Sequence, residues 1–409
     1  MKATCLLCLL LLACAGCVRV HVHGDHAADA ARPASASGTL RVATYNTSLY
    51  DDAANGLVRR LEAGDDQARR IAAVLQRVRP DIVLLNEFDH DSAHRAADLF
   101  QRDYLEQAQP GGGEPLRYPY RYLAPVNTGV PSGLDLDRSG AIGRVGRDHG
   151  NYAWGYGLHP GQYGMLVLSR YPVDTAAART FQRLKWSAMP GAARPVEPDS
   201  GTPYYADATW MQLRLSSKSH WDVPIHAPGG TLHLLASHPT PPVFDGPEDR
   251  NGARNADEIR LWREYISGGG KPWLCDDTGR CGGLEAGAHF VIAGDLNNDP
   301  VDGDGRHDAI VGLLEHPRVL PHATPRSQGA IEAAAKYVAA GIAHRGAAAL
   351  ATGDFGGQVG TLRLDYVLPS TGLRLAGSGV YWPASTEPAG SLVTASDHRL
   401  VWVDVTIEP

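Results

Sequence analysis

Several short segments of the chain show the alternation of apolar and polar residues that is typical of strands. Leu40 and Val42 alternate with polar residues in LRVATYN, which predicts a strand that ends at Asn46. The unbroken apolar run IVLL predicts a buried strand that delivers Asn86 and Glu87 at its end. The segments QYGMLVLSRYPV, TLHLLASH, HFVIAG, LRLDYVL and LVWVDVTI predict further strands.

Helical spacing of apolar residues appears between these strands. DDQARRIAAVLQRVRP predicts a helix that begins near Asp65 and ends before Pro80. RNADEIRLWREYI predicts an amphipathic helix, which Asn255 with Glu258 would cap. An Ala-rich stretch from about 331 to 340 predicts another helix. From 101 to 160 the chain is rich in Gly, Pro and Tyr without a period, which indicates long loops or an insertion beside the core.

The N-terminal residues show the pattern of an export signal. Lys2 precedes CLLCLLLLACAG, an apolar run that is too short to span a bilayer. We therefore expect residues 1–17 to be a signal peptide of the lipoprotein type and residues 18–38 to be a flexible linker. Acylation of Cys17 would tether the protein to a membrane, whereas Cys14 is a rival processing site and ordinary secretion is the alternative. The expected location is the periplasm, the cell envelope or the exterior.

Composition and charge narrow the function classes. The chain has 409 residues, 43% of them hydrophobic and 20% charged, which is the composition of a globular protein. Its formal charge of -7 and the lack of a long Lys/Arg run argue against tight nonspecific binding to duplex DNA. We expect a monomer with one catalytic domain over residues 39–407. Cys275 and Cys281 lie in a polar loop where an oxidising compartment would permit a disulfide, and whether they are bridged stays open.

Polar side chains stand where the predicted strands end. A single case is usually explained by a turn, because strands often stop at Asp or Asn. Here polar residues stand at the ends of several predicted strands. Strand ends that share one edge of a sheet supply side chains to one cleft. The set therefore predicts a functional site. Its members are Asn46, Glu87, Asp295, Asn297 and Asp397.

Motifs that contain these residues follow one another along the chain. They are ATYN with Asn46, DIVLLNEFD with Glu87, ASHPTPP with His238, GDLNNDP with Asp295 and Asn297, LRLDYV with Asp365, and SDHRLV with Asp397 and His398. Together they resemble the endonuclease/exonuclease/phosphatase family, over Leu40 to about Ile407. The resemblance implies an α/β fold, a four-layer α/β sandwich in which two packed mixed β-sheets are flanked by helices, with loop insertions.

The resemblance also implies a metal-dependent phosphoric ester hydrolase. Such an enzyme cleaves a phosphodiester or phosphomonoester by in-line attack of an activated water. Glu87 and Asn46, helped by Asp397, would hold Mg²⁺, for which Mn²⁺ is a plausible substitute. The metal would neutralise charge on the phosphoryl oxygens.

The remaining residues take catalytic roles under the same resemblance. Asp295 would orient and deprotonate the attacking water, and the Asn297 amide would donate to the transition state. His238 would donate a hydrogen bond or a proton. His398 would contact the phosphate, with its ring orientation set by Asp365.

Several alternatives stay open. The rival function is a non-catalytic binding protein on the same fold. Within the enzyme class, an endonuclease, a sugar or inositol phosphatase and a phospholipid phosphodiesterase would share this centre, so the phosphate-ester substrate could include nucleic acid. In SKSHWDVP, Lys218, His220 and Trp221 could meet a phosphate and a ring, or form a solvated loop with one packed tryptophan.

Overall fold

The computed structural model describes residues 38–408. The expected signal peptide, with Cys14 and Cys17, and nearly all of the expected linker lie outside these residues. Two large sheets form the centre of the molecule, and a small two-stranded sheet pairs β9 (Gly353–Asp354) with β10 (Thr361–Leu362). Over residues 38–408, no helix combines the length and the apolar character that crossing a membrane requires.

The first large sheet has six strands in the order β12-β13-β1-β2-β4-β3. The pair β1–β2 is parallel and the other neighbours are antiparallel. The strands are β1 (Thr39–Leu49), β2 (Ile82–Phe88), β3 (Tyr120–Tyr122), β4 (Met165–Ser169), β12 (Leu373–Val380) and β13 (Val401–Ile407).

The second large sheet has five strands in the order β11-β8-β7-β6-β5. Here β7–β8 is the parallel pair and the other neighbours are antiparallel. The strands are β5 (Arg179–Thr180), β6 (His220–Ala227), β7 (Gly230–Ser237), β8 (His289–Asp295) and β11 (Asp365–Pro369).

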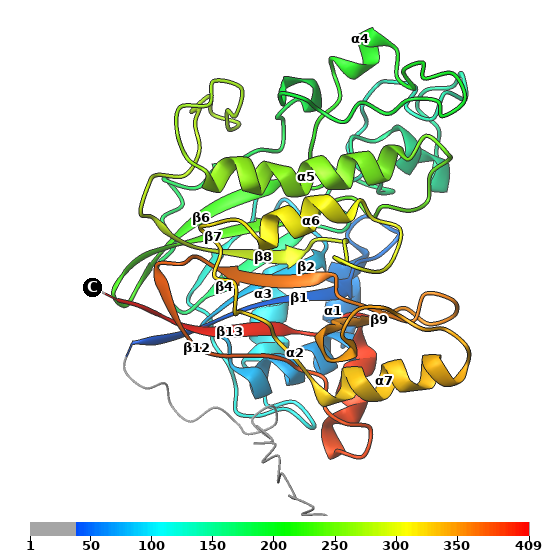
Figure 1. Cartoon of the computed structure of the whole chain (residues 1–409). Helices are drawn as coiled ribbons and strands as arrows, with labels where there is room; N and C mark the ends of the chain where they lie inside the picture. The colour runs from blue at the N-terminus through cyan, green and yellow to red at the C-terminus, as the bar shows by residue number, and fades with distance from the viewer. Residues whose placement is uncertain (1–37, 409) are drawn as a thin grey trace, which may run out of the picture.

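Helices cover the outer faces of the two sheets (Figure 1). Side chains of α1, α2 and α3 pack on the six-stranded sheet, and those of α5 and α6 pack on the five-stranded sheet. The helices are α1 (Gly56–Ala63), α2 (Asp66–Val78), α3 (Arg95–Leu99), α4 (Asp207–Trp210), α5 (Arg250–Ile266), α6 (His307–Leu314) and α7 (Gln328–Ala339). Shorter helical segments are η1 (Phe100–Leu105), η2 (Gly146–Tyr152), η3 (Trp186–Ala188), η4 (Ala348–Leu350) and η5 (Pro388–Ala395).

The apolar residues of the strands explain this layering. Side chains alternate between the two faces of a strand. In β1, Val42 packs between the sheets, whereas Tyr45 faces the helices; in β8, Ala293 packs between the sheets and Ile292 faces the helices. Both sheets are therefore apolar on both faces and must be covered on both sides. The predicted four-layer α/β sandwich is confirmed.

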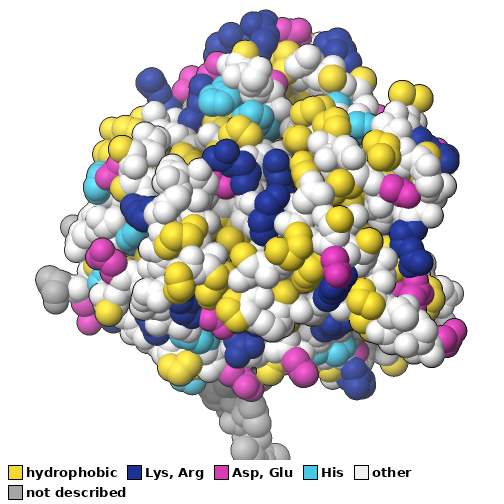
Figure 2. All heavy atoms as spheres, turned by 90° about the horizontal axis from the view of Figure 1, so that it is seen from above, with side chains coloured by type: hydrophobic (Ala, Val, Ile, Leu, Met, Phe, Trp, Pro, Cys, Tyr) yellow, Lys and Arg dark blue, Asp and Glu magenta, His cyan; other side chains and the backbone are white. Residues whose placement is uncertain are grey.

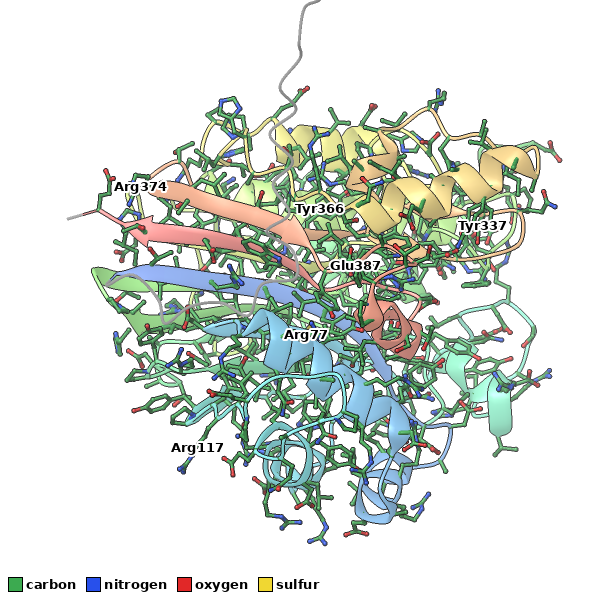
Figure 3. The ribbon with its side chains drawn as sticks, turned by 90° about the horizontal axis from the view of Figure 1, so that it is seen from below. Arg77, Arg117, Tyr337, Tyr366, Arg374 and Glu387 are labelled. Atoms are coloured by element: carbon green, nitrogen blue, oxygen red, sulfur yellow. A yellow bond between two sulfur atoms is a disulfide. The ribbon has the colours of Figure 1, made fainter. Side chains whose placement is uncertain are left out.

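Each large sheet contains one β-α-β unit at its centre. In the first, α1 and α2 connect β1 to the parallel strand β2; in the second, α5 connects β7 to β8. The carboxyl ends of parallel neighbours lie at the same edge of a sheet, which is where open α/β sheets bind ligands. Figure 3, seen from below, shows Arg374 at one end of the molecule and Tyr337 toward the other.

The surface carries mixed side chains. On the face shown in Figure 2, Lys and Arg side chains are interspersed with acidic, hydrophobic and neutral ones. Disulfide-bonded Cys275 and Cys281 close a loop whose Asp276 accepts a hydrogen bond from Arg179 of β5 at 2.7 Å. The sequence left open whether these two cysteines are bridged, and in this structure they form a disulfide.

Some predicted elements have different bounds in the structure. The helix expected to begin with a cap at Asn255 begins at Arg250, so Asn255 and Glu258 lie inside α5 and that capping prediction was wrong. The strand expected in LRLDYVL is split at Arg363 and Leu364 into β10 and β11. At this break, side-chain oxygens accept the hydrogen bonds of the backbone amides. Arg363 N donates to Asp299 Oδ2 at 2.8 Å, and Leu364 N donates to Thr352 Oγ1 at 3.0 Å.

Candidate active site

The predicted residues converge at the carboxyl end of the parallel strands. Asn46 continues the face of β1 that holds Val42, and Asp295 continues the face of β8 that holds Ala293, so both point into the space between the sheets. His238 directly follows β7, and Asp365 begins β11. The apolar layer between the sheets thus ends in a polar cluster.

Glu87 reaches this cluster by a local change in backbone. The alternation in β2 would direct its side chain toward the helices, where Val83 and Leu85 lie. Glu87 instead has φ 54°, in the left-handed region, which non-glycine residues adopt infrequently. Asn297, which follows β8, has φ 52°. These conformations place both side chains where a regular strand would not.

Asn46 joins the carboxylates of the two sheets. Its Nδ2 donates to Glu87 Oε1 at 3.1 Å and to Asp295 Oδ2 at 3.0 Å. Burial raises the pKa of Glu87, although the hydrogen bond from Asn46 opposes the shift. Burial also raises the pKa of Asp295, to about 7, against the opposing charge of His398. Burial therefore disfavours the charged form of both carboxyl groups, and a cation bound beside them would offset this effect.

His398 lies between two carboxylates of adjacent strands. Asp295 and Asp365 are directly paired across β8 and β11. His398 Nδ1 is 2.8 Å from Asp365 Oδ2, and its Nε2 is 3.5 Å from Asp295 Oδ2. Burial alone would lower the pKa of His398, but the charges of Asp365 and Asp295 raise it to about 10. The ring is thus an imidazolium at neutral pH and separates two like charges.

His238 is the second histidine beside Asp295. Its Nε2 lies 3.4 Å from Asp295 Oδ2 and 4.0 Å from Glu87 Oε1. Burial holds the pKa of His238 well below its usual value, and the positive charges of Lys218 and His398 add to the shift. His238 is therefore neutral at pH 7, and this favours donation of a hydrogen bond over donation of a proton.

Asn297 and Asp397 stand at the edges of the cluster. Asn297 Nδ2 donates to the Pro239 carbonyl at 3.1 Å, and its second N–H remains for a ligand. Asp397 is exposed, and its charge contributes to the raised pKa of Glu87 after the larger effect of burial. Among the predicted residues within 38–408, Asp397 is the one that faces solvent.

Lys218 is a buried cation at the same site. Burial lowers the pKa of its ammonium group, whereas the carboxylates of Glu258 and Glu87 act in the opposite direction. The structure decides between the two interpretations of SKSHWDVP for each of the three residues. Trp221 is fully buried between the sheets, and His220 is fully buried with Nε2 2.9 Å from the Glu258 carbonyl. Of the three, Lys218 alone shares the polar cluster.

Helix α5 holds the loops that carry the site. Glu258 accepts from Ser217 N at 2.7 Å and from Thr240 N at 2.6 Å, and these residues adjoin Lys218 and the segment after His238. Asn255 Nδ2 donates to the carbonyls of Thr240 and Leu296 at 2.8 and 3.0 Å. The sequence analysis missed this role. The available signal was two strongly polar residues on the apolar face that also carries Ile259 and Trp262.

The donor set suits a hard divalent cation. Glu87 and Asp295 offer carboxylate oxygens, and a half-turn of the Asn46 amide would offer its oxygen where Nδ2 now stands. Asp295, Asp365 and His398 also offer ligand atoms within 4.8 Å of one another. Nδ1 of His398 is already bonded to Asp365, so this ring offers Nε2 alone, whereas hard cations prefer the carboxylate and amide oxygens of Glu87, Asp295 and Asn46. The Glu87 side is the better fit.

Comparisons with known proteins found one family model and several solved structures that are similar to this chain. A model of the "Endonuclease/Exonuclease/phosphatase family" matches residues 43–398. An endonuclease/exonuclease/phosphatase structure from Beutenbergia cavernae is similar at 18% identity, with 90% of this chain and 72% of that chain covered and a TM-score of 0.48. Sphingomyelinase C from Streptomyces griseocarneus is similar at 18% identity, with coverage of 90% and 99% and a TM-score of 0.42. No curated protein sequence matches.

Proposed function

Because the chain belongs to the endonuclease/exonuclease/phosphatase family, we propose that it hydrolyses phosphate esters by in-line attack of an activated water, with Mg²⁺ as the cofactor. Members of this family are generally phosphoesterases. One observation carries the proposal: the Asp295 carboxylate lies within 3.5 Å of Nε2 of both His238 and His398. A buried carboxylate between two ring nitrogens, beside oxygen donors for a metal, suits a water-activating base.

The roles follow from the charges of the side chains. Asp295 accepts a proton from water when it is ionised, and its pKa of about 7 matches that task. His398, as an imidazolium, stabilises negative charge on the phosphoryl oxygens, and Asp365 fixes its ring. His238 donates a hydrogen bond as the neutral imidazole.

Lys218 and Asn297 complete the donors on the protein. The buried ammonium of Lys218 adds positive charge, and the amide of Asn297 donates to a phosphoryl oxygen. Glu87 and Asn46, with Asp397, are the residues that would hold Mg²⁺. When bound, the ion neutralises phosphoryl oxygens and stabilises the leaving oxygen. The non-catalytic alternative is not favoured, since a binding protein has no need of the complete set.

Metal removal and a substrate panel test the proposal. Purified protein with Mg²⁺ is expected to release nitrophenolate from bis-p-nitrophenyl phosphate or from its monoester. EDTA should abolish the reaction, and Mg²⁺ or Mn²⁺ should restore it. Asp295→Asn should fold normally and lose orders of magnitude in kcat, because it removes the positioned base. Chelator-resistant turnover, or near-full activity of this variant, would contradict the mechanism.

We also propose that the protein is exported and anchored through an acylated Cys17. The charged residue, the short apolar run and the cysteine that follows Ala15 and Gly16 support this. Mass spectrometry of the mature N-terminus is expected to find a lipid-modified Cys17, and Cys17→Ala should move the protein from the membrane fraction to the soluble fraction. A mature chain that begins at Cys14, or elsewhere without lipid, would refute the assignment.

A further inference from the structure

Two tyrosine rings stand side by side next to Glu87. The ring centroids of Tyr50 and Tyr163 are 4.5 Å apart, with an angle of 54° between the planes. The two residues are far apart in the sequence, so the fold brings the rings together. Each ring is half-buried and keeps part of its surface open to solvent.

The backbone fixes both rings beside the candidate site. Tyr50 follows Leu49, whose partner across β1 and β2 is Phe88, the residue after Glu87. On the other side, Phe88 N donates to the carbonyl of Gly164, the residue after Tyr163, at 3.1 Å. The tyrosines therefore flank the end of β2 where Glu87 turns into the site.

Asp89 ties the two tyrosine-bearing segments together. Its Oδ2 accepts from Asp51 N at 2.9 Å, and its Oδ1 accepts from Tyr163 N at 3.0 Å. Asp89 is buried, and Tyr163 is held at φ 56°. A left-handed conformation at a bulky residue costs free energy and persists where the surroundings enforce it. The relative position of the rings is thus set before any ligand binds.

The hydroxyl groups of this pair are not used by the fold. Within residues 38–408, neither the Tyr50 nor the Tyr163 hydroxyl has a hydrogen-bond partner. In contrast, the Tyr104 hydroxyl donates to the Leu61 carbonyl and the Tyr118 hydroxyl donates to the Pro80 carbonyl. Two fixed rings with free hydroxyls beside a charged centre are suited to contact a ligand.

The surrounding charge limits the kind of ligand. Burial raises the pKa of Tyr50, and the negative charges of Glu87 and Asp397 add to the shift. Asp52 lies on the same side, where Arg147 and Gln162 hold its carboxylate. Beside the platform, the cation that could meet a further phosphate of a nucleic-acid strand is Arg147, and it is already paired with Asp52. A small ester that carries one phosphate and a planar ring fits better.

We propose that Tyr50 and Tyr163 form a stacking platform for a planar ring attached through oxygen to the scissile phosphorus, so that the protein prefers small ring-bearing phosphate esters. This inference rests on the proposed hydrolase function. Aromatic side chains stack on planar rings in a way that tolerates many ring types. The platform therefore selects the class of substrate, an aryl phosphate ester, over an alkyl ester.

Calorimetric binding tests the platform apart from turnover. Asp295→Asn protein with Mg²⁺ is titrated with phenyl phosphate and with methyl phosphate. Phenyl phosphate is expected to bind about tenfold more tightly, and Tyr50→Leu or Tyr163→Leu should remove most of that preference while leaving methyl phosphate unchanged. Tyr50→Phe and Tyr163→Phe, which keep the rings, should retain it.

Tyr120→Leu is the matched control. Tyr120 is 40% exposed on β3 and pairs with Ser169, which itself pairs with Ile82 at the opposite end of β2 from Glu87. This variant should keep the full preference. Equal binding of the two ligands by the unsubstituted platform, or an equal loss of both in the Leu variants, would overturn the proposal.

Turnover gives a second reading. With Asp295 intact, the Tyr→Leu variants should raise KM for bis-p-nitrophenyl phosphate about tenfold and change kcat less. A short single-stranded oligonucleotide that binds more tightly than phenyl phosphate would overturn the preference for small esters. If every ester resists cleavage, the hydrolase proposal fails, while the calorimetric preference still decides whether the platform binds rings.

Discussion

Lys218 is a buried cation beside the carboxyl groups of the candidate site. The cluster contains the buried carboxyl groups of Asp295 and Asp365 and the half-buried one of Glu87, and the cations facing them are His398 and Lys218. In a buried site such charges interact strongly because solvent does not screen them. The ammonium group lowers the pKa of Glu87, whose overall shift is upward because burial dominates.

Removing this ammonium group should therefore weaken catalysis. Lys218→Met is expected to lower kcat/KM by one to two orders of magnitude, about the effect of losing one electrostatic donor. It should also move the acidic limb of the pH profile to higher pH, because the carboxyl groups lose a neighbouring positive charge. The measurement is kcat/KM between pH 5.5 and 9.

A surface lysine provides the comparison for this variant. Lys271 pairs with Glu264 on the outer side of α5, so Lys271→Met should leave the profile unchanged. An unaltered pH profile in Lys218→Met, with a normal melting temperature, would remove Lys218 from the proposed machinery.

At the scale of elements, α5 acts as a support for several loops. Glu258 is fully buried, and its two oxygens accept from the backbone of two separate segments. In Glu258→Gln one of these acceptors becomes an N–H₂ group that faces a backbone N–H. A buried donor without an acceptor costs about 1–3 kcal/mol of stability.

Activity should fall further than this loss of stability explains. Glu258→Gln is expected to lower kcat at least tenfold at a temperature where the variant remains folded, because the segments with Lys218 and His238 shift. Glu264→Gln, on the exposed side of the same helix, is the control. The assay combines thermal melting with kcat for both variants. Full activity in Glu258→Gln would show that the loops hold their positions without this carboxylate.

The sequence predicted the elements better than their contacts. Alternating or unbroken runs of apolar residues located β1, β2, β7, β8 and β13, because each strand packs on one or both faces. The pattern at Asn255 and Glu258 was misinterpreted as a cap, because the same spacing occurs where one helical face meets loops. Glu87 was expected at the site from its position, but the backbone turn that directs it there has no periodic signal.

At the scale of the whole molecule, buried neutral histidines make the fold sensitive to acid. His220 is fully buried, with Nδ1 2.7 Å from Ser216 Oγ and Nε2 2.9 Å from the Glu258 carbonyl. Burial lowers the pKa of His220 to about 4. The unfolded chain therefore takes up a proton near pH 6.5, before the folded protein does. The stability that the neutral His220 ring contributes is fully present above pH 6.5 and is lost as pH falls toward 4.

Replacing this ring should flatten the acidic loss of stability. His220→Gln, whose amide can donate to the Glu258 carbonyl, is expected to remove up to about 3 kcal/mol of the difference between pH 7 and pH 4. Urea unfolding at pH 7, 5.5 and 4.5 measures it. His226, at the exposed end of β6, provides the control variant His226→Gln. Identical pH dependence of the free energy of unfolding in both variants would refute this assignment. In His220→Gln, buried His238 should still leave some loss of stability toward acidic pH.

The arrangement of the layers came from the resemblance of motifs rather than from periodicity. The segment from 101 to 160 stayed unassigned because side chains, not regular backbone pairing, hold much of it in place. Asn127 Nδ2 donates to the carbonyls of Gln182 and Ser216, and Arg254 donates to the Trp154 carbonyl. Such long-range contacts leave no repeating pattern in the sequence.

The direction of β1 also determines which end of the domain would carry the tether of an anchored protein. Thr39 pairs with Thr406, so the described chain enters and leaves at one end of the sandwich, and β1 then runs toward Asn46 at the other. A lipid attached upstream of Thr39 would hold the molecule by the end remote from the catalytic cluster. Because the expected linker is flexible, it would not fix the orientation of the molecule, but it would leave the catalytic cluster unobstructed by the tether and accessible to solutes that diffuse past the cell envelope.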